Sequence, residues 1–141
     1  AYIKMTVAKP DKSCFVSFYQ HIRRFRIYGQ DGKLKRDVIL DLFPGQECPE
    51  VDDNMRLIHP ICVYTTDNYI YSLNLDMTTE DVEDRKTTPN IQVFDWEGKP
   101  LIQYKLDCFI NTFAVDEVAH KIYGVFVEDE DHIYVFNLPQ L

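Results

Sequence analysis

The sequence lacks the features that mark several large classes of protein. Its 141 residues contain only five Gly and seven Pro, which argues against a disordered or low-complexity chain. No apolar run approaches the roughly 18 residues that a membrane-spanning helix requires. The net charge of −8 argues against nucleic-acid binding, which needs a basic surface.

Familiar catalytic and metal-binding motifs are also missing. There is no Gly-x-Ser-x-Gly, no His-Glu-x-x-His and no Gly-rich phosphate loop. None of the four cysteines has the CxxC spacing of zinc-knuckle or thioredoxin-type proteins. Cys14 and Cys62 are expected in strands as small apolar residues, and a disulfide between Cys48 and Cys108 is left open.

What the sequence does contain is an internal repeat. Residues 24–41 align with residues 90–107 without a gap, at an offset of 66. The alignment pairs Asp31-Gly32-Lys33 with Glu97-Gly98-Lys99. A third copy begins with Ile133-Tyr134-Val135-Phe136-Asn137, which matches Ile91-Gln92-Val93-Phe94-Asp95. The chain therefore consists of similar units rather than one irregular sheet.

Two shorter apolar runs precede each copy, so the unit is predicted to have four strands. One of these runs recurs as Phe15-Val16-Ser17-Phe18, Ile70-Tyr71-Ser72-Leu73 and Ile122-Tyr123-Gly124-Val125. The segments are rich in β-branched and aromatic residues and are separated by Gly, Asp, Asn and Pro, as strands and turns are. The predicted strands cover residues 3–7, 14–19, 24–28 and 34–42, then 61–65, 69–75, 91–94 and 101–106, then 110–115, 121–127 and 133–138.

Several local features follow from this pattern. The Gly residues of the Asp31-Gly32 and Glu97-Gly98 pairs are predicted to supply the positive φ of hairpin turns. Residues 76–90 are expected to form a polar loop, and residues 128–131 an acidic link between strands. The tyrosines of the second strand in each unit are expected to pack in the core and between units: Tyr69, Tyr71 and Tyr123.

Four antiparallel strands in about 40–50 residues is the blade of a β-propeller. The Ile-x-Val-Phe-Asp-x-x-Gly-Lys and Lys-Ile-Tyr-Gly-Val phrases resemble those of NHL-like and TolB-like six-bladed propellers. Within these, the chain resembles the C-terminal part of predicted bacterial lipoprotein or periplasmic proteins. The resemblance implies an all-β scaffold and a periplasmic or outer-membrane-associated location, and it assigns no catalytic residue.

The predicted organisation is a single, partial propeller. It comprises a blade at residues 1–42, a connection at 43–58, a blade at 59–107 and an incomplete blade at 108–141. A stack of three blades leaves open strand edges. Closing a six-bladed ring would therefore need either the N-terminal blades of a longer parent chain or a second copy of this chain.

The acidic residues are distributed unevenly on this architecture. A propeller places alternate strand connections on opposite faces, and thirteen of the twenty-three acids fall in the longer connections of one face. We predict that this face binds a protein or a polar ligand, because clustered acids focus the electrostatic field. Solvated loops that keep an all-β protein soluble are the alternative. The candidate binding residues are Asp52, Asp53, His59, Glu80, Asp81, Glu83, Asp84, Arg85, Glu128, Asp129, Glu130 and Asp131.

Two hypotheses about function follow. The first is a non-catalytic binding or interaction scaffold that uses the acidic loop face and needs no cofactor. The second is part of a calcium-dependent hydrolase-type propeller, similar to lactonases and esterases, with the ion in the channel. Calcium prefers several carboxylate oxygens, but the segment from Asp76 to Asp84 lacks the glycine turn and terminal Glu of an EF-hand.

Overall fold

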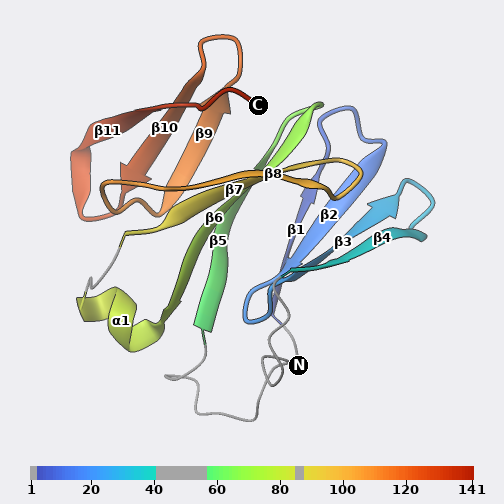
Figure 1. The fold of residues 1–141 in the computed structure, drawn as a ribbon, viewed down its shortest axis with the longest axis horizontal. Coiled ribbons are helices and arrows are strands. Elements are labelled where there is room, and N and C mark those ends of the chain that lie inside the picture. The colour runs from blue at the N-terminus through green and yellow to red at the C-terminus, as the bar shows by residue number, and fades with distance from the viewer. Residues whose placement is uncertain (1–2, 41–56, 85–87) are drawn as a thin grey trace.

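A computed structural model describes residues 3–40, 57–84 and 88–141. These residues form three separate antiparallel sheets of four, four and three strands (Figure 1). In each sheet the strands follow the order of the chain, so every neighbouring pair is a hairpin or meander. The predicted class, two four-stranded blades and a three-stranded third, is confirmed.

Most strand bounds lie close to the predicted ones, but β5 and β11 each begin four residues earlier, so β5 starts within the predicted connection 43–58. The first sheet contains β1 (Lys4–Ala8), β2 (Cys14–Tyr19), β3 (Arg24–Gly29) and β4 (Leu34–Ile39). The second sheet contains β5 (Leu57–Thr65), β6 (Tyr69–Thr78), β7 (Asn90–Asp95) and β8 (Pro100–Lys105). The third sheet contains β9 (Thr112–Asp116), β10 (Lys121–Phe126) and β11 (Asp129–Asn137).

Glycine closes the two repeated hairpins, as the repeat predicts. Gly32 has a φ of 79° and Gly98 a φ of 86°, a region that side chains with a Cβ rarely adopt. Gly98 also meets the first sheet, because a Cβ built there would lie 2.6 Å from Cγ2 of Val38. The second of these turns is therefore a contact between sheets as well as a hairpin.

The second sheet lies between the other two and is buried on both faces. On one face Ile70 and Phe94 join the core of the first sheet, where Phe25 stacks on Phe18 and meets Phe94 edge-on. On the other face Tyr71 and Val93 pack against the third sheet. Because both faces of this sheet are covered, nearly every residue of β6 is buried.

Two predicted loops are wrong in part. The segment at 76–90 is not simply a loop: β6 continues to Thr78 and a short helix, α1 (Thr79–Asp84), follows. The Thr78 hydroxyl accepts the Asp81 N–H at 3.2 Å while the Asp81 carboxylate accepts the Thr78 N–H at 3.5 Å, a capping box that starts the helix. The predicted acidic link at 128–131 is a turn at 127–128, and β11 begins at Asp129.

Three cysteines lie within the described residues, and none of them forms a disulfide. Cys14, Cys62 and Cys108 are free thiols, whereas Cys48, the other half of the pairing left open, lies outside the described residues. Within the described ranges no helix is long and apolar enough to cross a membrane.

Candidate functional site

The strand connections lie at two ends of the sheets. Figure 1 shows the turns β1–β2, β5–β6 and β9–β10 at the top and α1 with the β2–β3 loop at the bottom. Antiparallel order places the β3–β4 and β7–β8 turns with the first group. We call residues 9–13, 30–33, 66–68, 96–99 and 117–120 the turn end, and residues 20–23, 79–84, 106–111 and 127–131, which include the first residues of β11, the loop end.

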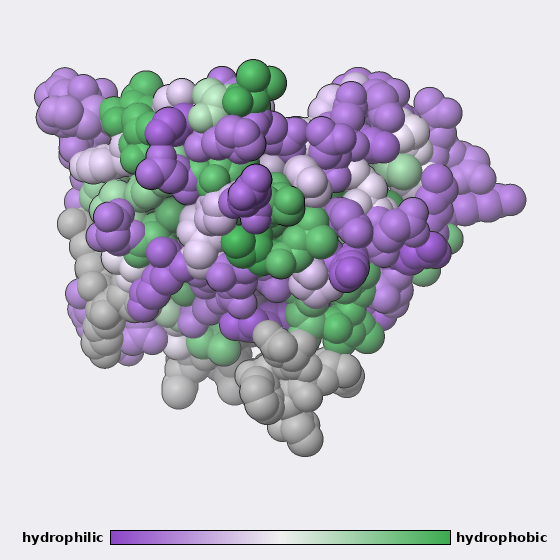
Figure 2. Space-filling model, turned by 45° about the horizontal axis from the view of Figure 1, so that its top comes forward, coloured by the Kyte–Doolittle hydropathy of each residue, from purple (hydrophilic) through white to green (hydrophobic). Residues whose placement is uncertain are grey.

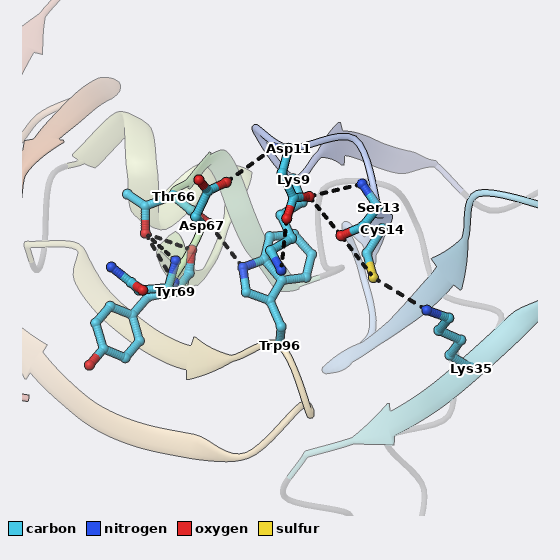
Figure 3. A network of polar contacts seen from close by, with 10 residues as sticks. Lys9, Asp11, Ser13, Cys14, Lys35, Thr66, Asp67, Tyr69 and Trp96 are labelled. Carbon is cyan, nitrogen blue, oxygen red and sulfur yellow. Dashed lines mark hydrogen bonds and ion pairs between the residues drawn. The ribbon is translucent and has the colours of Figure 1, made fainter.

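The turn end joins the first and second sheets by direct polar contacts (Figure 3). The Asp11 N–H donates to the Asp67 carboxylate of the second sheet at 3.1 Å. Within the second sheet, the Trp96 indole N–H donates to the Thr66 carbonyl at 2.9 Å. The Lys9 ammonium lies 5.6 Å from the centre of the Trp96 ring. Figure 2, in which the top of Figure 1 comes forward, shows mainly hydrophilic side chains with separate hydrophobic patches.

Glu117 joins the second and third sheets at the same end. Its carboxylate accepts hydrogen bonds from the Thr66 hydroxyl at 2.6 Å, the Tyr71 hydroxyl at 2.9 Å and the Asn68 amide at 3.1 Å. Burial, together with the hydrogen bond to Glu117, raises the pKa of Tyr71, so this phenol stays protonated. Satisfied contacts of this kind assign the turn end a structural role.

The loop end contains a small polar pocket at the seam between the first and second sheets. Its centre is Asp76, a residue of β6 with a φ of 54°, which is rare for a residue other than glycine. The ring Nδ1 of His59 lies 2.7 Å from Oδ1 of Asp76. Arg23, from the β2–β3 loop, forms an ion pair of 3.1 Å with Oδ2, and the Asn90 amide donates to the same oxygen at 2.8 Å.

These contacts set the charge of Asp76. Burial by itself raises the pKa of a carboxyl group, but hydrogen bonds from His59 and Asn90 and the charge of Arg23 outweigh it. The net effect lowers the pKa of Asp76 below its ordinary value, so the group is a carboxylate at neutral pH. Both of its oxygens are occupied, which leaves it poorly placed to transfer a proton.

Amide and hydroxyl groups extend the network across the second sheet. The Ser72 hydroxyl donates to the Asn74 side-chain carbonyl at 2.6 Å, and the Asn74 amide donates to that of Asn90 at 3.3 Å. The Gln103 amide donates to the same Asn90 oxygen at 3.1 Å. The pocket above these groups has a volume of about 20 Å³, enough for about one water molecule but not for an organic substrate.

The predicted binding residues occupy three kinds of position. His59 is buried, 6% exposed, and belongs to the seam pocket instead of the surface. Asp81 caps α1, and Asp129 accepts hydrogen bonds from Tyr134 at 2.7 Å and His132 at 2.9 Å. The remaining acids of α1 and of the β10–β11 hairpin are exposed: Glu80, Glu83, Asp84, Glu128, Glu130 and Asp131. Asp52, Asp53 and Arg85 lie outside the described residues.

Sequence reasoning missed Arg23 and Asn74 as residues that line the pocket, and Asn90 as a hydrogen-bond donor to Asp76. A signal was present in β6, where Ser72, Asn74 and Asp76 alternate with apolar residues and so share one face of the strand. The partner Arg23 gives no such signal, because its contact depends on how two sheets pack. No group of three or more His, Cys, Asp or Glu that could hold a metal ion occurs in the parts of the chain that the structure covers.

Comparison with known families agrees with this architecture. Residues 61–118 match the family model described as TolB-like 6-blade propeller-like. The matched region runs from within β5 through the second sheet to the turn after β9. No curated protein matches the chain. The three sheets of this all-β chain are thus consistent with propeller blades, and the family match covers most of the central sheet.

Proposed function

We propose that this chain is a non-catalytic binding scaffold whose acidic loop end recognises a cationic protein segment. The observation that carries the proposal is the exposure of acids from two different sheets at this end. Glu80 and Glu83 extend from α1 after the second sheet, and Glu130 and Asp131 extend from the start of β11 in the third sheet. All four are exposed, and none forms an ion pair with another described residue.

The proposal is supported by the way these acids are held. The capping box between Thr78 and Asp81 fixes the start of α1, and the Asp129 contacts with His132 and Tyr134 fix the start of β11. Acids on ordered elements bind a partner at less entropic cost than acids on a flexible loop. The chain's net charge of −8 adds long-range attraction for a cationic partner.

Catalysis finds less support at the seam pocket. The His59–Asp76 pair has the composition of a catalytic dyad, but both carboxylate oxygens are engaged and the pocket holds about one water molecule. Calcium fits poorly there as well, because Asp76 is the only carboxylate among the described residues that line the pocket, whereas calcium takes six to eight oxygen ligands.

A labelled basic peptide tests the proposal. Fluorescein-labelled hexalysine should bind the chain in low salt, measured by fluorescence anisotropy, and binding should weaken as salt screens the charges. The double variant Glu80→Gln/Glu83→Gln should weaken binding about 5- to 30-fold, taking each exposed charge as worth about 0.5–1 kcal/mol.

A matched double variant at the turn end provides the control. Asp67→Asn/Glu97→Gln removes the same charge from two exposed residues and should change the affinity less than twofold. Equal losses in both variants would show that only net charge matters and would contradict a loop-end site. Absence of binding at low salt would contradict the proposal outright.

The calcium-dependent hydrolase is the second candidate, favoured only by the composition of the His59–Asp76 pair. A bound ion raises the melting temperature by mass action. Thermal unfolding with 1 mM calcium against 1 mM magnesium decides this candidate: an unchanged midpoint in calcium removes it.

A further inference from the structure

The outward face of the third sheet is apolar and exposed. We define this face by Tyr123, Val125, Ile133 and Val135, of which Ile133 is 64%, Val135 56% and Tyr123 37% exposed. Tyr123 and Val135 are direct cross-strand partners on β10 and β11, so their exposed side chains lie next to each other. A contiguous apolar patch on a sheet face is typical of an interaction surface.

The equivalent residues of the second sheet are buried in a contact between sheets. The four residues of the outward face correspond to Tyr71, Leu73, Ile91 and Val93 of the second sheet, each of which is fully buried against the third sheet. The pairing is also the same, since Tyr71 lies opposite Val93 as Tyr123 lies opposite Val135. Tyr123 was expected to pack between units, and no described sheet of this chain covers it.

The first sheet repeats the pattern once more. The equivalent positions are Val16, Phe18, Phe25 and Ile27, all buried against the second sheet. We call each contact between neighbouring sheets a joint, and these four equivalent residues the core row. In both joints inside the chain, the core row of one sheet packs on the facing side of the next sheet. The third sheet carries the same row with no next sheet among the described residues.

The matching surface lies at the other end of the same chain. The outward face of the first sheet carries Phe15 opposite Tyr28 and Ser17 opposite Arg26. The equivalent pairs in the second sheet are Ile70–Phe94 and Ser72–Gln92, the face that receives the first sheet's core row. The chain therefore carries both halves of one further joint.

Charge favours the same match. Around Tyr19, the outward face of the first sheet carries Lys4 and Arg24, whose cations lie 4.6 and 5.7 Å from the ring centre. Arg26 lies on the same face, and the Asp37 carboxylate pairs with both arginines, so the bases outnumber the acids. The third sheet's outward rows carry two acids, Asp116 and Asp131, and one base, Lys121, which lies opposite Asp116. A weakly basic face thus meets a weakly acidic one, which offsets part of the repulsion between two chains of net charge −8.

We propose that a second copy of this chain docks on the outward face of the third sheet through the outward face of its own first sheet. The contact is head-to-tail, so each pair of chains forms two identical joints and leaves no apolar sheet face open. Two chains with three sheets each in their described residues supply six sheets, the blade number in the description of the matched family model.

The oligomeric state in solution tests the proposal. Light scattering on a sizing column should give twice the chain mass of 16.7 kDa at about 100 μM. Val135→Lys should yield monomer, because it places a charge in the joint. Val118→Lys changes a residue that is 94% exposed at the turn end and should leave the dimer intact. Circular dichroism melts check that both variants fold.

A mixing experiment separates head-to-tail docking from other contacts. Phe15→Lys should also yield monomer, and an equimolar mixture of Phe15→Lys and Val135→Lys should recover a dimer through the one joint that remains intact. A monomeric wild-type chain would overturn the proposal. So would a dimer that Val135→Lys leaves intact, or one that Phe15→Lys leaves intact, since the latter indicates contact between two third sheets.

Discussion

The turn end and the loop end use the same kinds of residue for different purposes. At the turn end, Glu117 and Asp67 accept hydrogen bonds from a neighbouring sheet. At the loop end, Asp76 does so in the seam pocket, while Glu80 and Glu83 face solvent without an ion pair to another described residue. A carboxylate is structural in this molecule where it is partly buried and a second sheet supplies donors to it. The Glu97–Arg36 pair also joins two sheets, but its side chains are 76% and 54% exposed.

This comparison separates the carboxylates that stabilise the fold from those proposed to bind a partner. Removing a carboxylate that bridges sheets leaves donors without partners, which costs free energy of folding. Removing an exposed carboxylate changes mainly the field at the surface. Mutations at the two ends are therefore expected to affect different measurements.

The largest effect is expected at Glu117. Glu117→Ala removes acceptors for Thr66, Asn68 and the buried Tyr71 hydroxyl, and we expect a loss of about 2–3 kcal/mol in the free energy of unfolding. Urea denaturation followed by circular dichroism measures this. Glu97→Ala, which breaks only an exposed ion pair with Arg36, should cost about 0.5 kcal/mol or less. Similar losses in the two variants would contradict the bridging role.

Asp76 should make stability depend on acid pH. Its pKa is lowered in the folded state, so its contribution is present above the unfolded value of about 4 and is lost as pH falls through the folded value. Asp76→Asn should cost about 1–2 kcal/mol at pH 7 and flatten the stability profile below about pH 4. Urea midpoints between pH 2.5 and 7 test this; parallel profiles for wild type and variant would contradict it.

Trp96 should contribute a smaller link at the turn end. Trp96→Phe keeps an aromatic ring but removes the N–H that donates to the Thr66 carbonyl, and we expect a loss of about 1 kcal/mol. Thermal melts by circular dichroism measure it. Tyr69→Phe, in which the structure shows no hydrogen bond from the hydroxyl to a described residue, serves as the control and should stay within about 0.5 kcal/mol.

The smallest effect on stability is expected on α1. Glu80→Gln/Glu83→Gln should change the free energy of unfolding by about 0.5 kcal/mol or less, because both side chains are exposed. The same variant should weaken hexalysine binding, as proposed above. A destabilised variant with unchanged peptide affinity would reverse the assignment of the two ends.

Much of the fold could be predicted from the repeat. Gapless similarity between units specifies the strand order, and the turn pairs specify where Gly32 and Gly98 take a positive φ. Helix α1 was missed because its start depends on one reciprocal contact between Thr78 and Asp81 within an acidic stretch. The exposure of Tyr123 could not be predicted from the sequence. The alternating pattern places this residue on one face of the sheet but does not show whether another sheet covers that face.

The candidate site was predicted less well. The exposed acids of α1 and β11 lie at one end, as the strand connections imply, but His59 turned inward. A lone His in sequence gives no indication of the Asp76 carboxylate that holds its ring. The contact with Arg23 joins two sheets that are separate in the repeat, so only the packing of sheets shows it.

The most direct test of the account is a residue-resolved titration. Two-dimensional NMR of the ¹⁵N-labelled chain with unlabelled hexalysine locates binding without any mutation. We predict that the largest amide shift changes fall at residues 79–84 and 128–131, with little change at 66–68, 96–99 and 117–120. The largest changes at those turn-end residues would contradict the division of the molecule into a structural end and a recognition end.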